Sequence, residues 1–188
     1  MILALGESIL ISGATFGELP DAAETIAAFV IAFIGSATLW WLYFDRAEAA
    51  GMDIISAASD PGRLGLTAYT YFHIPMVAGI VVVAAADEVT IAHPADPATG
   101  AVAALILGGP LLFLLGNALF KWALWDYVPR SRIVAMGALI ALIPFAAVAS
   151  SLWLSVAATL VLIGLALWDL RVAGADHPDR DPDVAPRR

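Results

Sequence analysis

Glu7 lies inside an apolar stretch at the start of the chain, within the sequence LGESI at residues 5–9. A carboxylate among apolar side chains is costly unless it holds a proton, a cation or a hydrogen-bond donor. Ser8, Ser12 and Thr15 continue a line of hydroxyl groups at helical spacing. We expect Glu7 to face other helices, either as a proton or cation site or as a protonated carboxyl group bonded to a neighbouring helix.

His73 is the second residue whose type points to chemistry, because imidazole exchanges protons near neutral pH. It follows Tyr69 by four positions, so the two side chains share one face of a helix. Pro75 lacks a backbone N–H, which frees the carbonyl of Tyr71 and favours a kink. The sequence therefore predicts either a proton carrier in a polar site or a structural histidine that donates to one backbone carbonyl.

Asn117 and Lys121 form a third polar pair, four residues apart on one helix face. Lys121 can extend its ammonium group to the membrane surface, whereas Asn117 lies one turn deeper. From the helical rise, Glu7, His73 and Asn117 each lie roughly 8–12 Å from the same predicted membrane surface. Two interpretations follow, which are a shared polar cavity open to the cytoplasm and three separate hydrogen bonds between helices.

Acidic residues gather in the connection predicted at residues 87–100, which contains Asp87, Glu88 and His93. No Lys or Arg accompanies them, so this outer mouth should attract cations. The alternative is a solvated acidic rim with no function of its own. The spacing matches no specific metal motif, so we predict no metal site and no cofactor.

The elements that must position these residues are membrane helices. Hydrophobic residues make up 61% of the 188 residues and charged residues only 14%, against about 45–50% and about 25% in soluble domains. A bilayer core about 30 Å thick needs roughly 20 apolar residues per helix. The sequence predicts an all-α, polytopic bundle with the lipid bilayer as its solvent. Six apolar segments are predicted, at residues 2–17, 25–44, 65–86, 101–125, 132–149 and 152–169.

Charge predicts the orientation of this bundle. All nine basic residues fall on or near one side of the predicted spans, and that side should be cytoplasmic, together with both termini. The net charge of −8 argues against a nucleic-acid partner. Residues 46–58 are expected to form a short interfacial helix, and residues 172–188 a disordered, polar cytoplasmic tail that follows a transmembrane domain at 1–171.

Five motifs stand out along the chain, which are ALGESI at 4–9, WWLYFD at 40–45, YTYFHIP at 69–75, DE at 87–88 with HP at 93–94, and LGNALFK at 115–121. Together they resemble the bacterial low-temperature-requirement A (LtrA) family. The resemblance implies an integral protein of the bacterial cytoplasmic, or inner, membrane, linked by name to growth in the cold. Members are roughly twice this long, so the chain looks like their C-terminal half. That implies either a missing N-terminal half or a homodimer partner.

Two functions fit these observations, and neither names a substrate. The first is a proton- or cation-coupled transporter, or half of one, because polar groups within membrane helices commonly mark a transport path. The second is a non-transporting membrane protein of cold or envelope-stress adaptation, because the many Ala and Gly residues also suit plain helix packing. An enzyme ranks last, since the sequence carries no recognisable catalytic pair.

Overall fold

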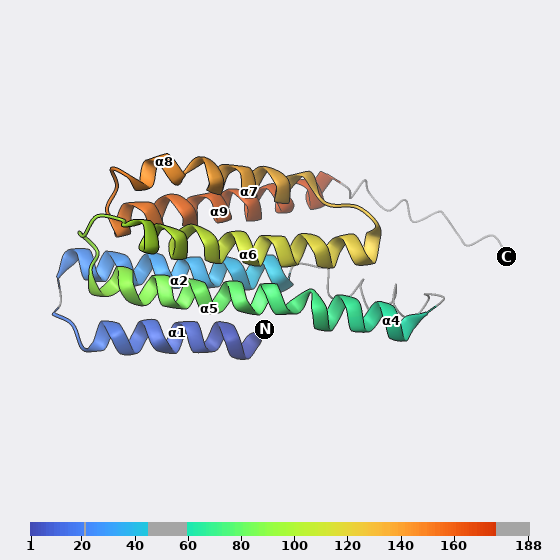
Figure 1. The fold of residues 1–188 in the computed structure, drawn as a ribbon, viewed down its shortest axis with the longest axis horizontal. Coiled ribbons are helices and arrows are strands. Elements are labelled where there is room, and N and C mark those ends of the chain that lie inside the picture. Colours follow the sequence, from blue (N-terminus) through green and yellow to red (C-terminus); the bar gives the residue numbers. More distant parts are fainter. Residues whose placement is uncertain (21, 45–59, 176–188) are drawn as a thin grey trace.

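The computed structural model describes residues 1–20, 22–44 and 60–175 as a bundle of roughly antiparallel helices (Figure 1), and within these ranges it contains no strand. The predicted all-α class is therefore confirmed. The predicted interfacial helix at 46–58 and residues 176–188 of the predicted tail lie outside the described residues. The helices are α1 (Ile2–Gly17), α2 (Ala23–Phe44), α4 (Pro61–Leu66), the π-helix η1 (Thr67–Tyr71), α5 (His73–Ala92), α6 (Gly100–Trp125), α7 (Arg130–Ala141), α8 (Ile143–Ala146) and α9 (Ser151–Ala175).

Four of the helical stretches are long and apolar enough to cross a membrane. They are Ala23–Phe44, Pro61–Ala92, Gly100–Trp125 and Ser151–Arg171. Helix α1 is also apolar but has 16 residues. The chain is thus a multi-pass membrane protein by its helices, while the number of six spans stays a prediction.

The segment at 132–149, predicted as one span, is not one continuous helix. Helix α7 ends at Ala141, and a short turn through Leu142 leads into α8. Pro144 explains the break, because it has no N–H for the carbonyl of Ile140 and its ring opposes a continuous helix. A turn at residues 147–150 separates α8 from α9, which begins at Ser151, so the boundary between the predicted segments 132–149 and 152–169 is present.

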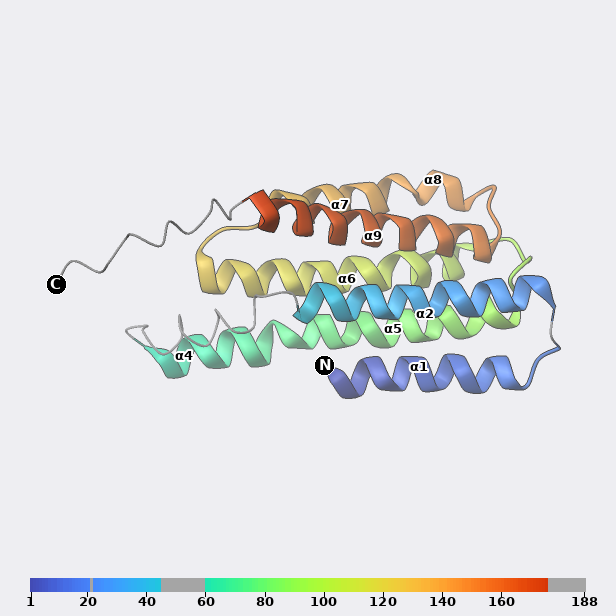
Figure 2. The ribbon, with the colours of Figure 1, turned by 180° about the vertical axis from the view of Figure 1, so that it is seen from behind.

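Helices α5 and α6 form the centre of the bundle and have the most extensive contact of any pair. Figures 1 and 2 show α1 on the outside of the layer formed by α2 and α5, with α9 and α7 on the opposite side of α6. Three described glycines let the central helices touch. A Cβ atom on Gly79 would lie 2.5 Å from the backbone nitrogen of Phe113, one on Gly109 would lie 2.9 Å from that of Val83, and one on Gly116 would lie 2.8 Å from that of Met76. Close backbone contact through small residues is the usual way for helices to associate in lipid.

The two ends of the bundle differ in charge. At one end, the connection after α5 pairs with the connection before α9, where the backbone nitrogen of Ala98 donates to the carbonyl of Ala149 over 3.0 Å. The opposite end holds the start of α1 and the end of α9 (Figure 1). The five described basic residues all lie toward this opposite end, as the charge asymmetry requires, and we call it the basic end. They are Arg63, Lys121, Arg130, Arg132 and Arg171.

Candidate functional site

Asp87 lies inside helix α5 and not in a connection, contrary to the sequence prediction. The helix continues to Ala92 and ends at His93, directly before Pro94. A residue before proline disfavours the helical conformation, so the break belongs at His93 and not at Asp87. The Asp87 side chain turns inward and only 9% of the residue is exposed, whereas Glu88 is exposed. Of the three residues predicted to form the outer mouth, Asp87 therefore lies in the interior of the bundle.

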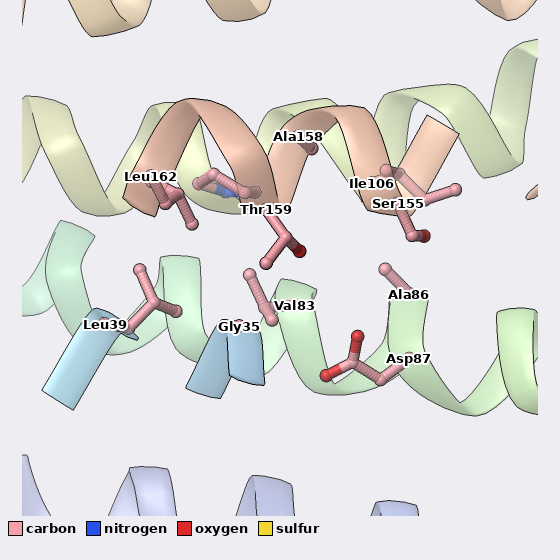
Figure 3. Close-up of a pocket in the computed structure, with 11 residues that line it drawn as sticks. Gly35, Leu39, Val83, Ala86, Asp87, Ile106, Ser155, Ala158, Thr159 and Leu162 are labelled. Carbon is pink, nitrogen blue, oxygen red and sulfur yellow. The ribbon is translucent and has the colours of Figure 1, made fainter. Parts of the chain in front are cut away.

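A small cavity of about 30 Å³ lies in front of Asp87. Helices α2, α5, α6 and α9 all contribute to its wall, so it sits at the centre of the bundle. In Figure 3 the Asp87 carboxyl group points into the space under α9, from which Ser155 and Thr159 extend toward α5. The lining residues are Gly35, Leu39, Val83, Ala86, Asp87, Ile106, Pro110, Ser155, Ala158, Thr159 and Leu162.

No described basic residue forms an ion pair with the Asp87 carboxyl group. Among the residues that the structure describes, none donates a hydrogen bond to its buried oxygen Oδ2. The nearby hydroxyl of Ser155 forms a hydrogen bond of 3.4 Å with the hydroxyl of Thr90. A buried carboxyl group without a donor costs free energy unless it holds a proton or a cation. The cavity is large enough for one water molecule or one small ion.

His73 sits where the chain passes from the π-helix η1 into α5. Its Nδ1 donates to the carbonyl of Ala68 over 3.0 Å, and its Nε2 lies 2.9 Å from the hydroxyl of Tyr43. Because a carbonyl can only accept, a neutral His73 carries its proton on Nδ1 and accepts a hydrogen bond from Tyr43. The ring of Tyr69 stacks on it at 5.4 Å. The structure thus brings Tyr69 and His73 together, with the carbonyl bond that we expected of a structural histidine.

Glu7 does not face the bundle in this structure. Its residue is exposed, while Ser8 and Ser12 on the same helix are buried. The hydroxyl of Ser8 lies 3.2 Å from that of Ser36 on α2. The hydroxyl line of α1 therefore makes the helix contact, and the carboxyl group lies on the side away from α2 and α5.

Asn117 belongs to a buried network at the basic end of the bundle. Its Oδ1 accepts a hydrogen bond of 3.1 Å from Nε of Arg132, which is fully buried. Nη1 of Arg132 forms an ion pair with Asp169 and donates to the hydroxyl of Ser131 over 3.2 Å. The Ser131 hydroxyl in turn donates to the second oxygen of Asp169 over 3.1 Å. This network joins α6, α7 and α9.

The structure therefore does not gather the predicted polar residues into one site. Among the described residues, no hydrogen bond or ring contact joins Glu7 or Asn117 to His73. Lys121 is half-buried near the basic end of α6. His93 is exposed at the other end, where its ring lies 3.8 Å from the carboxyl group of Asp96. These contacts therefore do not form a shared cavity for Glu7, His73 and Asn117.

The ion pair of Arg132 and Asp169 is not among the predicted polar sites. In the sequence, Arg132 contributes only to the charge asymmetry, and Asp169 belongs to no candidate site. The signal was available, because both are charged residues at the ends of apolar segments on helices predicted to be adjacent and antiparallel. Their spacing along the chain placed them at the same membrane surface, where they could neutralise each other.

The chain is similar to proteins of one family. The family described as bacterial low temperature requirement A protein (LtrA) matches residues 1–167. An uncharacterized protein of Rhizobium meliloti (strain 1021) is 31% identical over 173 residues, which cover 90% of this chain and 41% of that relative. The chain thus spans less than half the length of this curated relative. No solved structure matches it.

Proposed function

Because the chain belongs to the bacterial low temperature requirement A (LtrA) family and is an integral membrane protein, we propose that it is a proton- or cation-coupled transporter of the bacterial cytoplasmic membrane. The chain is such a transporter or half of one. The ion site is Asp87, and not the predicted set of Glu7, His73 and Asn117.

The observation that carries the proposal is the buried Asp87 carboxyl group, whose Oδ2 has no donor among the described residues. Acidic residues inside membrane helices are costly and commonly mark ion pathways or proton relays. Asp169, a partly buried acidic group at the basic end, is instead neutralised by Arg132. Asp87 is therefore the carboxyl group best suited to bind and release a cation as the bundle changes conformation.

The outer face of α1 supports the idea of one half in a larger assembly. Leu3 and Leu10 are 88% and 73% exposed, and Glu7 lies between them on the same face. A Cβ atom on Gly13 or Gly17 would meet nothing within 4 Å. These two small residues, four positions apart, therefore leave the helix surface accessible to another helix. A charged residue on a lipid-facing side would be costly. We propose that this face contacts further protein, either the part of a longer protein that this chain does not span or a second copy.

Ion flux into liposomes tests the proposal. Purified protein is reconstituted in vesicles with a pH-sensitive dye inside, and a proton or Na⁺ gradient is imposed. We expect faster decay of one gradient than in empty vesicles, and at least a tenfold slower decay with Asp87→Asn. Glu18→Gln is the control, because it removes one exposed carboxylate near the same membrane surface.

Two results would count against transport. Equal decay with and without the protein would refute transport by this chain alone and favour the non-transporting alternative from the sequence analysis. Equal decay for the wild type and Asp87→Asn would remove Asp87 from the pathway even if transport occurs.

A further inference from the structure

We infer that the cavity in front of Asp87 binds one monovalent cation of the size of Na⁺, held by the carboxylate together with hydroxyl and carbonyl oxygens. The inference rests on the proposed function and names the coupling ion for it. The cation would bind next to Oδ2 of Asp87, which is buried and has no hydrogen-bond donor among the described residues.

The walls of the cavity supply oxygen atoms beyond the carboxylate. Thr159 and Ser155 extend their hydroxyl groups from α9 toward Asp87 (Figure 3). Gly35 on α2 lies next to one of them, since a Cβ atom there would be in ordinary contact with the Thr159 hydroxyl at 3.5 Å. A carboxylate with neutral oxygens around it is the ligand type that hard cations prefer.

Helix α6 contains a carbonyl group that lacks the usual helical donor four residues later. Pro110 lies inside α6 and has no N–H, so the carbonyl of Ile106, four residues earlier, loses its usual donor. Both residues line the cavity. Released helix carbonyls are a known means of coordinating Na⁺ in transporters. A bare proton would need the carboxyl group alone and no such surrounding oxygens.

The charge and size of the cavity select the ion. Asp87 is the one titratable side chain among the described residues that line it, and no group of three His, Cys, Asp or Glu residues within the described ranges could hold a metal ion. A single negative charge matches a monovalent cation, whereas Ca²⁺ sites usually combine several carboxylates. A volume of about 30 Å³ accommodates one small ion that has lost most of its water.

Equilibrium binding of radiolabelled Na⁺ to the purified protein in detergent tests this inference independently of flux. We expect saturable binding of one ion per chain, with K⁺ competing at least tenfold less well. Asp87→Asn should abolish binding, and Thr159→Val should weaken it at least tenfold. Thr38→Val is the matched control, because that buried hydroxyl donates to Ile34 on its own helix and lies outside the cavity wall.

The outcomes separate the two proposals. Saturable Na⁺ binding without any flux leaves the cation site standing and refutes the transporter. Flux that depends only on the proton gradient, with no Na⁺ binding, supports the transporter and overturns the cation site. If Asp87→Asn does not fold, as judged by circular dichroism, the comparison of Thr159→Val with Thr38→Val decides. Equal Na⁺ affinity in those two variants would also overturn the site.

Discussion

The contact between α5 and α6 gives the sharpest test of the fold, through the substitution Gly79→Ala. A Cβ atom at position 79 would lie 2.5 Å from the backbone nitrogen of Phe113 and 2.8 Å from the carbonyl oxygen of Gly109. Ordinary contacts of a Cβ atom begin at 3.4 Å. Because both obstacles are backbone atoms, they cannot be relieved by a side-chain rotation. The two helices must therefore move apart by roughly 1 Å, and a gap of that size loses about a quarter to a half of the dispersion energy of the affected contacts.

The magnitude follows from two opposing effects. Overpacking a close contact costs about 1–3 kcal/mol, while Ala in place of Gly in a helix gains about 0.5–1 kcal/mol. Gly108→Ala separates the two effects, because position 108 lies on the same helix as Gly109 and a Cβ atom there meets nothing within 4 Å. The gain in helix propensity is common to both variants. Gly79→Ala should thus be less stable than Gly108→Ala by about 1–3 kcal/mol.

The assay is unfolding of the purified protein in micelles by increasing dodecyl sulfate, followed by far-ultraviolet circular dichroism. The free energy of unfolding is compared for the wild type and the two variants. We expect Gly79→Ala to fall below the wild type and Gly108→Ala to equal or exceed it. Equal stability of the two variants would show that the backbones of α5 and α6 do not touch at Gly79, and the central helix pair would be wrong.

Two further predictions concern the basic end and the orientation. Arg132→Met should lower the free energy of unfolding by about 3–5 kcal/mol in the same titration, because it leaves the partly buried Asp169 without its cation. Adding Asp169→Leu should restore most of that loss, so a double variant no more stable than the single one would contradict the ion pair. For orientation, a membrane-impermeant maleimide should label Asp96→Cys only from outside the cell and Tyr127→Cys only from inside, and the chain has no other cysteine. The reverse pattern would invert the topology.

The fold could be predicted well from the sequence, because lipid imposes a simple rule on helix length and polarity. The helices α1, α2, α6 and α9 lie close to the predicted segments. The break in 132–149 was less visible, since apolar residues continue across it and only Pro144 marks the point. The helical stretch Pro61–Ala92 also begins earlier than the predicted segment 65–86. An Asp60 cap, which accepts from the Arg63 nitrogen over 3.0 Å, begins a helix before the apolar run.

The candidate site was harder to predict, because burial depends on how helices rotate against each other. Asp87 and Glu88 are adjacent acidic residues, and nothing in their types says that one faces the centre and the other does not. The weak amphipathic pattern of an apolar helix gives little indication of its rotation. The prediction that Glu7 faces other helices depends on the same rotation, and Glu7 is exposed in this chain. The rule that a membrane carboxyl group faces protein holds only when the neighbouring protein is included, and this chain spans 41% of the relative that it matches.

The way each polar group is neutralised separates structural from functional residues in this bundle. At the basic end, Arg132 and Asp169 neutralise each other and Asn117 accepts a hydrogen bond from the guanidinium group. Nη2 of Arg132 has no acceptor among the described residues, but the two opposite charges balance and the network joins three helices. His73 is similarly engaged by Tyr43 and a backbone carbonyl. Asp87 lies near the opposite end of α5 and lacks such compensation at Oδ2 among the described residues. A group that must change partners during a cycle cannot be locked to a permanent one. The helix joints at the basic end therefore suit a fixed frame, and the neighbourhood of Asp87 suits the exchange of an ion.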